Sequence, residues 1–93
     1  VYDVFDYKKF ENLTVSVTIL HENQSTSGHS HFEADEIYFF MKGEGKIIID
    51  EQIQDCKEGD FFLIPRGAFH KVYNTTGYKN LEFVCVFEKY EGR

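Results

Sequence analysis

The hydrophobic positions of this chain fall into short runs rich in Val, Ile, Phe, Tyr and Thr, without helical spacing. Glycine, asparagine and aspartate separate the runs, and these residues tolerate the tight or left-handed backbone of turns. Short strands with frequent turns are typical of a sandwich or a barrel, and the pattern contains no amphipathic helix of convincing length. We therefore predict an all-β chain with strands at residues 1–7, 13–20, 27–32, 36–42, 45–50, 60–65, 70–74 and 81–89.

Several of these runs are apolar on both faces of the strand that they would form. In the run at residues 36–42, Tyr38 and Phe40 point to one side while Ile37 and Phe39 point to the other, because side chains alternate along a strand. An antiparallel sheet with one face in water would alternate more cleanly between apolar and polar residues. We therefore expect the outer face to be covered by a second copy of the chain, in a homodimer.

The composition argues against nucleic-acid and membrane partners. The chain has 93 residues, which fits a single domain spanning residues 1–93. Its formal net charge of −6 would repel phosphate backbones, so we expect no nucleic-acid partner. No apolar run approaches the roughly 20 residues that a membrane helix needs. Two cysteines, Cys56 and Cys85, do not make a disulfide framework, and we expect reduced thiols in a cytoplasmic protein.

Two histidines stand one residue apart, ahead of the run at residues 36–42. In a strand, His29 and His31 would project from the same side, about 7 Å apart. Strand twist would let the two imidazoles converge on one metal ion. The plainer alternative is that these histidines lie in turns or on the surface.

A carboxylate and a third histidine complete a candidate metal site. A turn at residues 33–35 would reverse the chain, so that Glu36 opens the next strand and faces inward; Glu33 or Asp35 would replace it if the turn lies elsewhere. His70 opens a further strand. We therefore predict that three imidazoles and one carboxylate meet around an ion inside a barrel, a ligand set that suits several transition metals.

The sequence resembles the cupins in two places. The stretch GHSHFEADEIYFFMKG, residues 28–43, is similar to the first cupin signature. The stretch GDFFLIPRGAFHKVYN, residues 59–74, matches the second signature at every spacing, and the fifteen residues between the two stretches are the short spacer of small microbial cupins. One departure is that the early glycine of the family usually stands several residues before the histidine pair, whereas Gly28 adjoins it.

The resemblance implies a small antiparallel jelly-roll β-barrel that is usually dimeric. It also implies a divalent metal ion, commonly Mn, Fe, Ni, Co, Cu or Zn in cupins, held by His29, His31, Glu36 and His70. Four protein ligands leave two open positions on a metal that prefers six, and these can take substrate or water. A ligand set without thiolate looks more like such an open site than like a closed structural zinc site.

The interior of the barrel is the expected chamber for a small molecule. Tyr38 is the candidate catalytic residue, because its hydroxyl can donate a hydrogen bond or a proton; the alternative is that it is only a core aromatic residue. Small-molecule sites are mostly apolar with few polar groups. We expect walls of that kind, formed by Tyr38, Phe40 and some of Phe62, Ile64, Val72 and Phe83.

The resemblance favours a metal-dependent enzyme that acts on a sugar, a sugar phosphate or a keto acid by isomerase or lyase chemistry through an enediolate. A second hypothesis is an Fe- or Cu-dependent dioxygenase. A third is a non-catalytic barrel that binds a small ligand, for example as the sensing part of a longer regulator. The same fold hosts many chemistries, so the site rather than the fold must separate these hypotheses.

Overall fold

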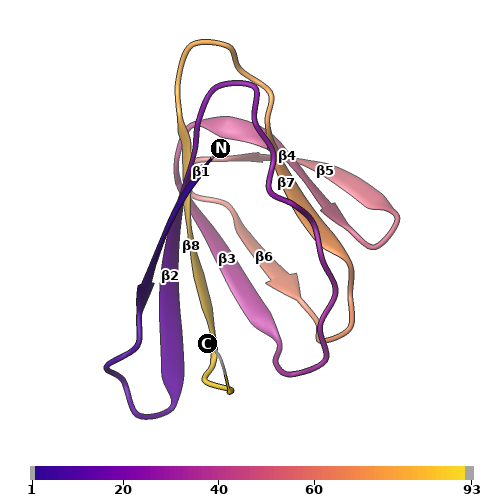
Figure 1. The fold of residues 1–93 in the computed structure, drawn as a ribbon. Coiled ribbons are helices and arrows are strands. Elements are labelled where there is room, and N and C mark those ends of the chain that lie inside the picture. The colour runs from indigo at the N-terminus through magenta and orange to yellow at the C-terminus, as the bar shows by residue number, and fades with distance from the viewer. Residues whose placement is uncertain (1, 92–93) are drawn as a thin grey trace.

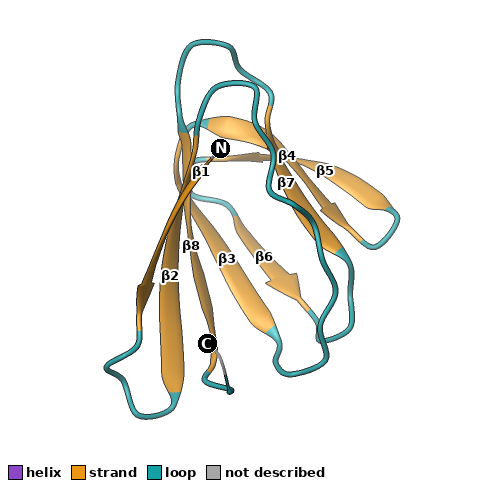
Figure 2. Ribbon diagram, viewed as in Figure 1, coloured by secondary structure: helices purple, strands orange, loops and turns teal. Residues whose placement is uncertain are grey.

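A computed structural model of the chain, which describes residues 2–91, contains eight antiparallel strands in two sheets (Figure 1). Five strands form one sheet in the order β1-β2-β8-β3-β6, and three form a second sheet in the order β5-β4-β7. The predicted all-β class is confirmed, and Figure 2 shows loops alone between the strands. The strands are β1 (Tyr2–Tyr7), β2 (Leu13–Leu20), β3 (Glu36–Lys42), β4 (Glu44–Ile49), β5 (Gln52–Lys57), β6 (Phe61–Ile64), β7 (His70–Asn74) and β8 (Leu81–Glu88).

Alternating side chains of the strands form the core. On β3, Tyr38 and Phe40 are buried, as their phase predicts, and the rings of Phe40 and Phe83 lie 5.2 Å apart. The same alternation on β8 buries one set of residues and leaves Val84 and Val86 half-buried on the other face. The largest fully buried side chains are Phe40, Phe83, Leu20, Ile47, Ile64 and Leu81. No helix long and apolar enough to cross a bilayer occurs among residues 2–91.

The prediction of a strand at residues 27–32 is wrong. This stretch belongs to an irregular segment between β2 and β3, which pairs with β7 through two isolated bridges, Ser25 to Tyr73 and His29 to His70. Gly28 has a φ of +76°, which is incompatible with an extended strand, and a Cβ there would come within 2.9 Å of the Phe69 ring. The glycine that departs from the cupin signature therefore marks the place where regular strand geometry is lost.

A strand at residues 52–57 was not predicted. β5 reads QIQDCK and pairs only with β4, at the edge of the small sheet. Only Cys56 of this strand is buried, so the sequence shows neither an apolar run nor alternation. Burial raises the pKa of the Cys56 thiol to about 12, and both Cys56 and Cys85 are buried, reduced thiols.

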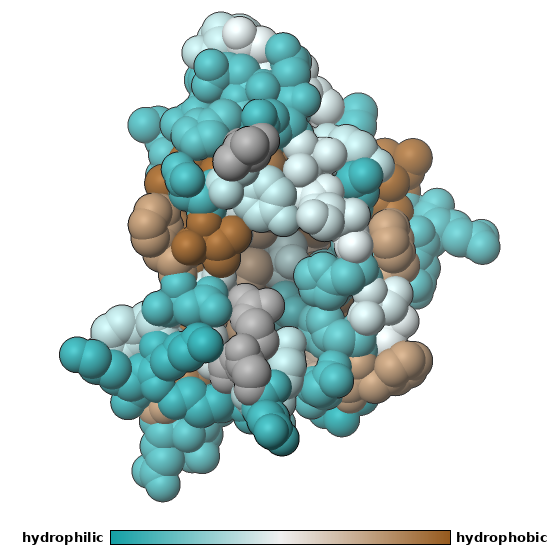
Figure 3. Space-filling model, in the orientation of Figure 1, coloured by the Kyte–Doolittle hydropathy of each residue, from teal (hydrophilic) through white to brown (hydrophobic). Residues whose placement is uncertain are grey.

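The outer face of the five-stranded sheet remains apolar. Its residues lie in register with one another across the strands, on the side opposite the core. In the view of Figure 3, which has the orientation of Figure 1, hydrophobic residues lie on the left and right sides, over both sheets, between hydrophilic regions above and below. The exposed large residues of the outer face are Phe5, Tyr7, Leu13, Ile37, Phe61 and Leu63.

The side chain of Asn74, at the end of β7, joins the end of β2 to the loop between β7 and β8. Its amide nitrogen lies 2.8–3.1 Å from the carbonyl oxygens of Leu20, His21 and Lys79. Its amide oxygen accepts hydrogen bonds from the backbone and the hydroxyl of Thr76, both at 3.0 Å. Asn74 therefore fixes the end of β2, where the irregular segment begins, to β7.

We expect Asn74→Ala to lower the free energy of unfolding by about 2–3 kcal/mol, because it leaves several buried backbone carbonyls without a partner. Urea unfolding followed by circular dichroism measures this change. The neighbouring exposed Thr75→Ala is the matched control and should change stability by less than about 0.5 kcal/mol. Equal effects of the two substitutions would contradict the role given to Asn74.

Candidate metal centre

His29 and His70 meet because the irregular segment pairs with β7 at this point. The backbone N–H of His29 donates to the carbonyl of His70 at 3.2 Å, and that of His70 donates to the carbonyl of His29 at 3.0 Å. Residues paired in this way in antiparallel backbone lie side by side. Their imidazole centroids are 4.3 Å apart, although His29 belongs to a loop and His70 to a strand.

His31 and Glu36 lie on either side of the bend that leads into β3. The bend is at residues 32–33, slightly earlier than the predicted turn at residues 33–35. Glu36 is the first residue of β3, is 3% exposed, and faces the interior as predicted. The Nε2 atom of His31 lies 2.5 Å from the Oε1 atom of Glu36.

A tight turn at residues 65–68 holds His31 in place. The amide of Gly67 donates to the carbonyl of His31 at 2.5 Å. Gly67 has a φ of +84°, and a Cβ at this position would come within 2.5 Å of the Phe32 ring. Only glycine therefore lets the loop before β3 approach the turn closely enough for this hydrogen bond.

The four predicted ligand residues form one cluster. One ligand atom from each of His29, His31, Glu36 and His70 lies within 4.8 Å of the others. Metal bonds from nitrogen or oxygen are about 2.0–2.2 Å long, so ligands on opposite sides of one ion are about 4.2 Å apart. The cluster thus needs to contract by less than about 1 Å, and these residues could hold a divalent metal ion.

The hydrogen bonds of His70 leave one ring nitrogen available as a ligand. Its Nδ1 atom lies 3.0 Å from the carbonyl oxygen of Ala68, so Nδ1 carries the proton and donates it. Its Nε2 atom is buried and has no hydrogen-bond partner among residues 2–91. A buried polar atom without a partner costs about 1–3 kcal/mol, and a metal ion would satisfy this nitrogen.

The two alternative carboxylates lie outside the cluster. The Glu33 side chain is 53% exposed, and its Oε1 atom is 3.8 Å from Nδ1 of His31. The Asp35 carboxylate is 58% exposed and accepts a hydrogen bond from the backbone N–H of Arg66 at 2.8 Å. Asp35 therefore binds the loop to the turn at residues 65–68, and Glu36 is the carboxylate that the structure groups with the histidines.

Comparison with known proteins identifies the family. The sequence profile of the cupin domain matches residues 16–87, which is most of the chain. The chain belongs to the cupin family. This cupin is 33% identical over 57 residues to an uncharacterized protein of Methanocaldococcus jannaschii, covering 61% of the chain and 45% of the relative.

A second uncharacterized relative, from Aquifex aeolicus, is 32% identical over 66 residues, covering 71% of the chain and 54% of the relative. The chain spans about half the length of these curated relatives. Its fold is similar to that of a Cupin 2 conserved barrel domain protein from Salinispora arenicola, with a TM-score of 0.83 and 20% identity. That match covers 95% of this cupin and 76% of the other chain, and it confirms the predicted jelly-roll barrel.

A cavity of about 120 Å³ lies beside the cluster, and its walls differ from the predicted ones. His29, Glu36 and Tyr38 line it, but Phe83 is the only other member of the predicted aromatic and aliphatic wall that does so among the described residues. Phe40, Ile64 and Val72 are packed in the core instead. Five of the remaining lining residues, Tyr2, Ser16, Thr18, Thr26 and Ser27, carry a hydroxyl, and Cys85 adds a thiol.

Sequence reasoning missed these polar residues for an identifiable reason. Strand β2 reads LTVSVTIL, and hydrophobicity alone would turn Val15, Val17 and Ile19 toward the core. The structure instead buries Ser16 and Thr18, while Val15 and Val17 face outward. The sequence shows that polar and apolar residues alternate along β2. The pairing with β8 decides which of these two sets faces inward.

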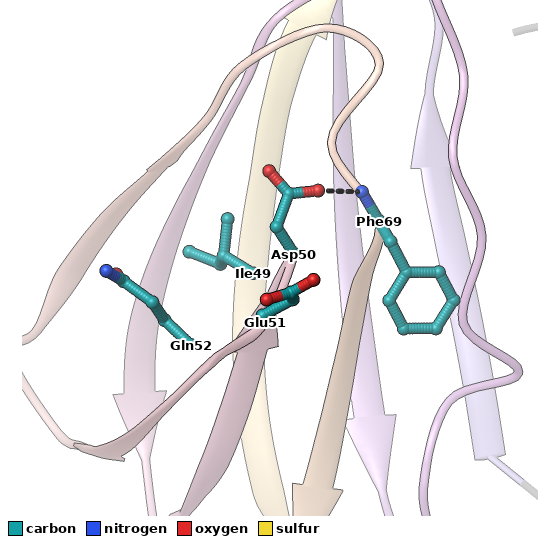
Figure 4. A pocket seen from close by; sticks show the side chains of 5 residues that line it. All are labelled: Ile49, Asp50, Glu51, Gln52 and Phe69. Carbon is teal, nitrogen blue, oxygen red and sulfur yellow. Dashed lines mark hydrogen bonds between the residues drawn. The ribbon is translucent and has the colours of Figure 1, made fainter.

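A second hollow, at the turn between β4 and β5, contains none of the cluster residues (Figure 4). Asp50, with a φ of 54°, exchanges backbone and side-chain hydrogen bonds with Phe69, at 2.7 and 3.0 Å. Glu51 and Gln52 lie on the same turn. The hollow follows the shape of this hairpin turn, and the metal-ligating residues lie apart from it in the histidine cluster.

We expect the purified chain to bind close to one equivalent of a divalent ion such as Zn²⁺ or Mn²⁺. His70→Ala should weaken this binding by at least about 100-fold, because it removes a ligand from the cluster. Isothermal titration calorimetry and elemental analysis measure affinity and content.

His21→Ala is the matched control for this substitution. His21 is the remaining histidine, and it contacts Asp3 and Asn80 rather than the cluster. Equal metal binding by the His21→Ala and His70→Ala variants would refute the candidate centre.

Proposed function

We propose that this cupin is a metal-dependent enzyme that acts on a small oxygen-rich molecule, of the sugar, sugar phosphate or keto acid class, by isomerase or lyase chemistry. In this proposal His29, His31, Glu36 and His70 hold the ion. The single observation that carries the proposal is that this cluster and the adjoining cavity share His29 and Glu36. A molecule in the cavity is therefore next to the position of the ion.

The ligand set favours an open, reactive centre. It contains no thiolate, whereas structural zinc sites are usually closed by four ligands that include cysteine. A divalent ion held there would supply Lewis-acid chemistry by polarising a carbonyl or hydroxyl of the substrate. The protein's part is to position the substrate in the cavity and to move its protons.

Tyr38 is the residue that we assign to proton transfer. Its ring stacks on Phe83 at 5.1 Å between centroids and meets the edge of the His70 ring at 5.8 Å. These contacts restrict the tyrosine, which lines the cavity from β3. A phenol hydroxyl held in this way can give a proton to one substrate oxygen and take one from the neighbouring carbon or oxygen.

We expect the metal-loaded protein to exchange the carbon-bound protons next to a carbonyl with deuterium from solvent. Proton NMR in D₂O, with pyruvate, galacturonate and glucose 6-phosphate as probes, measures this exchange for each metal form. Tyr38→Phe should reduce the rate by about 100-fold or more at unchanged metal content, since general acid–base catalysis contributes at least that much.

Tyr78→Phe is the matched control, because Tyr78 is 76% exposed and lies outside the cavity lining. Binding of probes without exchange in any metal form would instead support the non-catalytic barrel. Oxygen consumption by the Fe or Cu form would support the dioxygenase. Either result would overturn the isomerase or lyase proposal.

We also propose that the chain forms a homodimer through the outer face of its five-stranded sheet. On this face Ile37, Phe61 and Leu63 are 46%, 68% and 64% exposed. They lie on the adjacent strands β3 and β6, where Ile37 pairs with Leu63 and Phe39 pairs with Phe61. A contiguous apolar face on a small protein is typical of an interface between subunits.

Light scattering at micromolar concentration should therefore give the mass of a dimer, and Ile37→Glu should shift it to the monomer by burying a charge in the interface. Ile53→Glu is the matched control. Ile53 is 64% exposed but lies on β5, in the other sheet, so its substitution should leave the dimer intact. A monomeric wild-type protein would contradict the proposal.

A further inference from the structure

Strand β2 turns its polar residues toward the core and, apart from Leu20, its apolar residues outward. Thr14, Ser16 and Thr18 are 0%, 1% and 5% exposed, whereas Val15 and Val17 between them are only half-buried. Burying a hydroxyl without a hydrogen bond costs about 1–3 kcal/mol. Valine in place of each hydroxyl residue would avoid this cost, so packing alone does not account for the inward hydroxyls.

Two of the three hydroxyl residues face the cavity beside the cluster. Ser16 and Thr18 line it, whereas Thr14 does not. The side-chain hydroxyls of Ser16 and Thr18 take part in none of the hydrogen bonds found among residues 2–91. They are therefore available to a molecule in the cavity. The hydroxyl of Thr14 is fully buried and has no partner among the same residues.

The register of the sheet places these hydroxyls across the cavity from the cluster. Ser16 pairs with Cys85 on β8, and Cys85 pairs in turn with Tyr38 on β3. Tyr38 lies two residues after Glu36, so the two side chains share one face of the strand. Two strand spacings of about 4.8 Å separate β2 from β3, which gives about 10 Å between their backbones. A ligand that contacts both an ion at Glu36 and the hydroxyl of Ser16 or Thr18 must therefore span the cavity between β3 and β2.

The volume of the cavity limits the size of the ligand. A water molecule occupies about 30 Å³ in the liquid, so the cavity of about 120 Å³ holds roughly four waters. This space suits a molecule on the order of six non-hydrogen atoms. A three- or four-carbon acid fits within this volume, whereas an intact sugar phosphate would extend beyond it.

The charges around the cavity limit the charge of the ligand. Among residues 2–91 no lysine or arginine lines it, and Glu36 is its only acidic lining residue. A divalent ion bound by three neutral imidazoles and one carboxylate carries a net charge of about +1. One carboxylate of a ligand would balance that charge, whereas a phosphate dianion would bring excess negative charge with no cationic side chain beside it.

We propose that the cavity selects a compact monocarboxylate with an oxygen on the adjacent carbon, a 2-oxo or 2-hydroxy acid of three or four carbons, and that Ser16 and Thr18 hydrogen-bond its oxygens. This inference rests on the proposed function, since it requires a metal at the cluster. It narrows that function by excluding sugar phosphates and whole sugars. Ser16 and Thr18 thereby determine specificity, without taking part in the proton transfer.

The test is calorimetric binding of pyruvate and lactate to the zinc-loaded full chain. Ser16→Ala and Thr18→Val should each weaken binding by about 3- to 10-fold, the loss expected for one hydrogen bond. Thr14→Val is the matched control, because it removes an inward hydroxyl of the same strand that does not reach the cavity. It should leave the affinity unchanged. Gluconate and glucose 6-phosphate should bind the wild type at least 10-fold more weakly than pyruvate.

Zinc content, measured first on each variant, distinguishes failure of the metal centre from failure of the specificity role of Ser16 and Thr18. A wild-type chain that binds no zinc refutes the proposed metal centre, and this inference with it. A zinc-loaded chain whose pyruvate affinity is unchanged by Ser16→Ala and Thr18→Val refutes only the specificity role. Tight binding of gluconate or glucose 6-phosphate by the wild type refutes the size and charge limits. This test uses the wild-type protein alone, so it does not depend on whether a variant folds.

Discussion

The reciprocal backbone hydrogen bonds between His29 and His70 are the constraint on which the site depends. They join a segment without regular structure to the first residue of β7, and they place two imidazoles 4.3 Å apart. A histidine on an unattached loop would sample many positions, and ordering it around an ion would cost conformational entropy. Here the entropy is lost when the barrel folds, so the ligand atoms are already grouped.

The rest of the irregular segment is held by the same kind of isolated contact. Gly67 binds the carbonyl of His31, Asp35 accepts from the backbone of Arg66, and Asn74 joins the start of the segment to β7. Two of these contacts join the segment to the turn at residues 65–68, and the third joins it to the end of β7. The segment is therefore positioned as firmly as a strand, while its backbone is free to turn His29 and His31 toward the interior.

The five-stranded sheet divides its two faces in an unusual way. Its outer face is apolar, although it faces solvent in the single chain, and its inner face carries Ser16, Thr18 and Glu36. Away from these residues, the inner face is apolar, with Leu20 paired to Leu81 and Phe40 to Phe83. One end of the barrel thus supplies the core that stabilises the fold, and the other end is left polar for a ligand. In our proposals, a second subunit and a bound molecule complete the two faces.

The sequence by itself determined the class of fold, most strands and the four residues of the cluster, because these depend on local alternation and on the spacing of two motifs. It did not determine β5, whose edge position requires no apolar face, or the loss of the strand at residues 27–32, where Gly28 adopts a left-handed backbone. Only the tertiary structure decided which face of β2 points inward, because the register with β8 is a long-range pairing. The polar wall of the cavity follows from that pairing, and hydrophobicity along β2 alone predicts the opposite face.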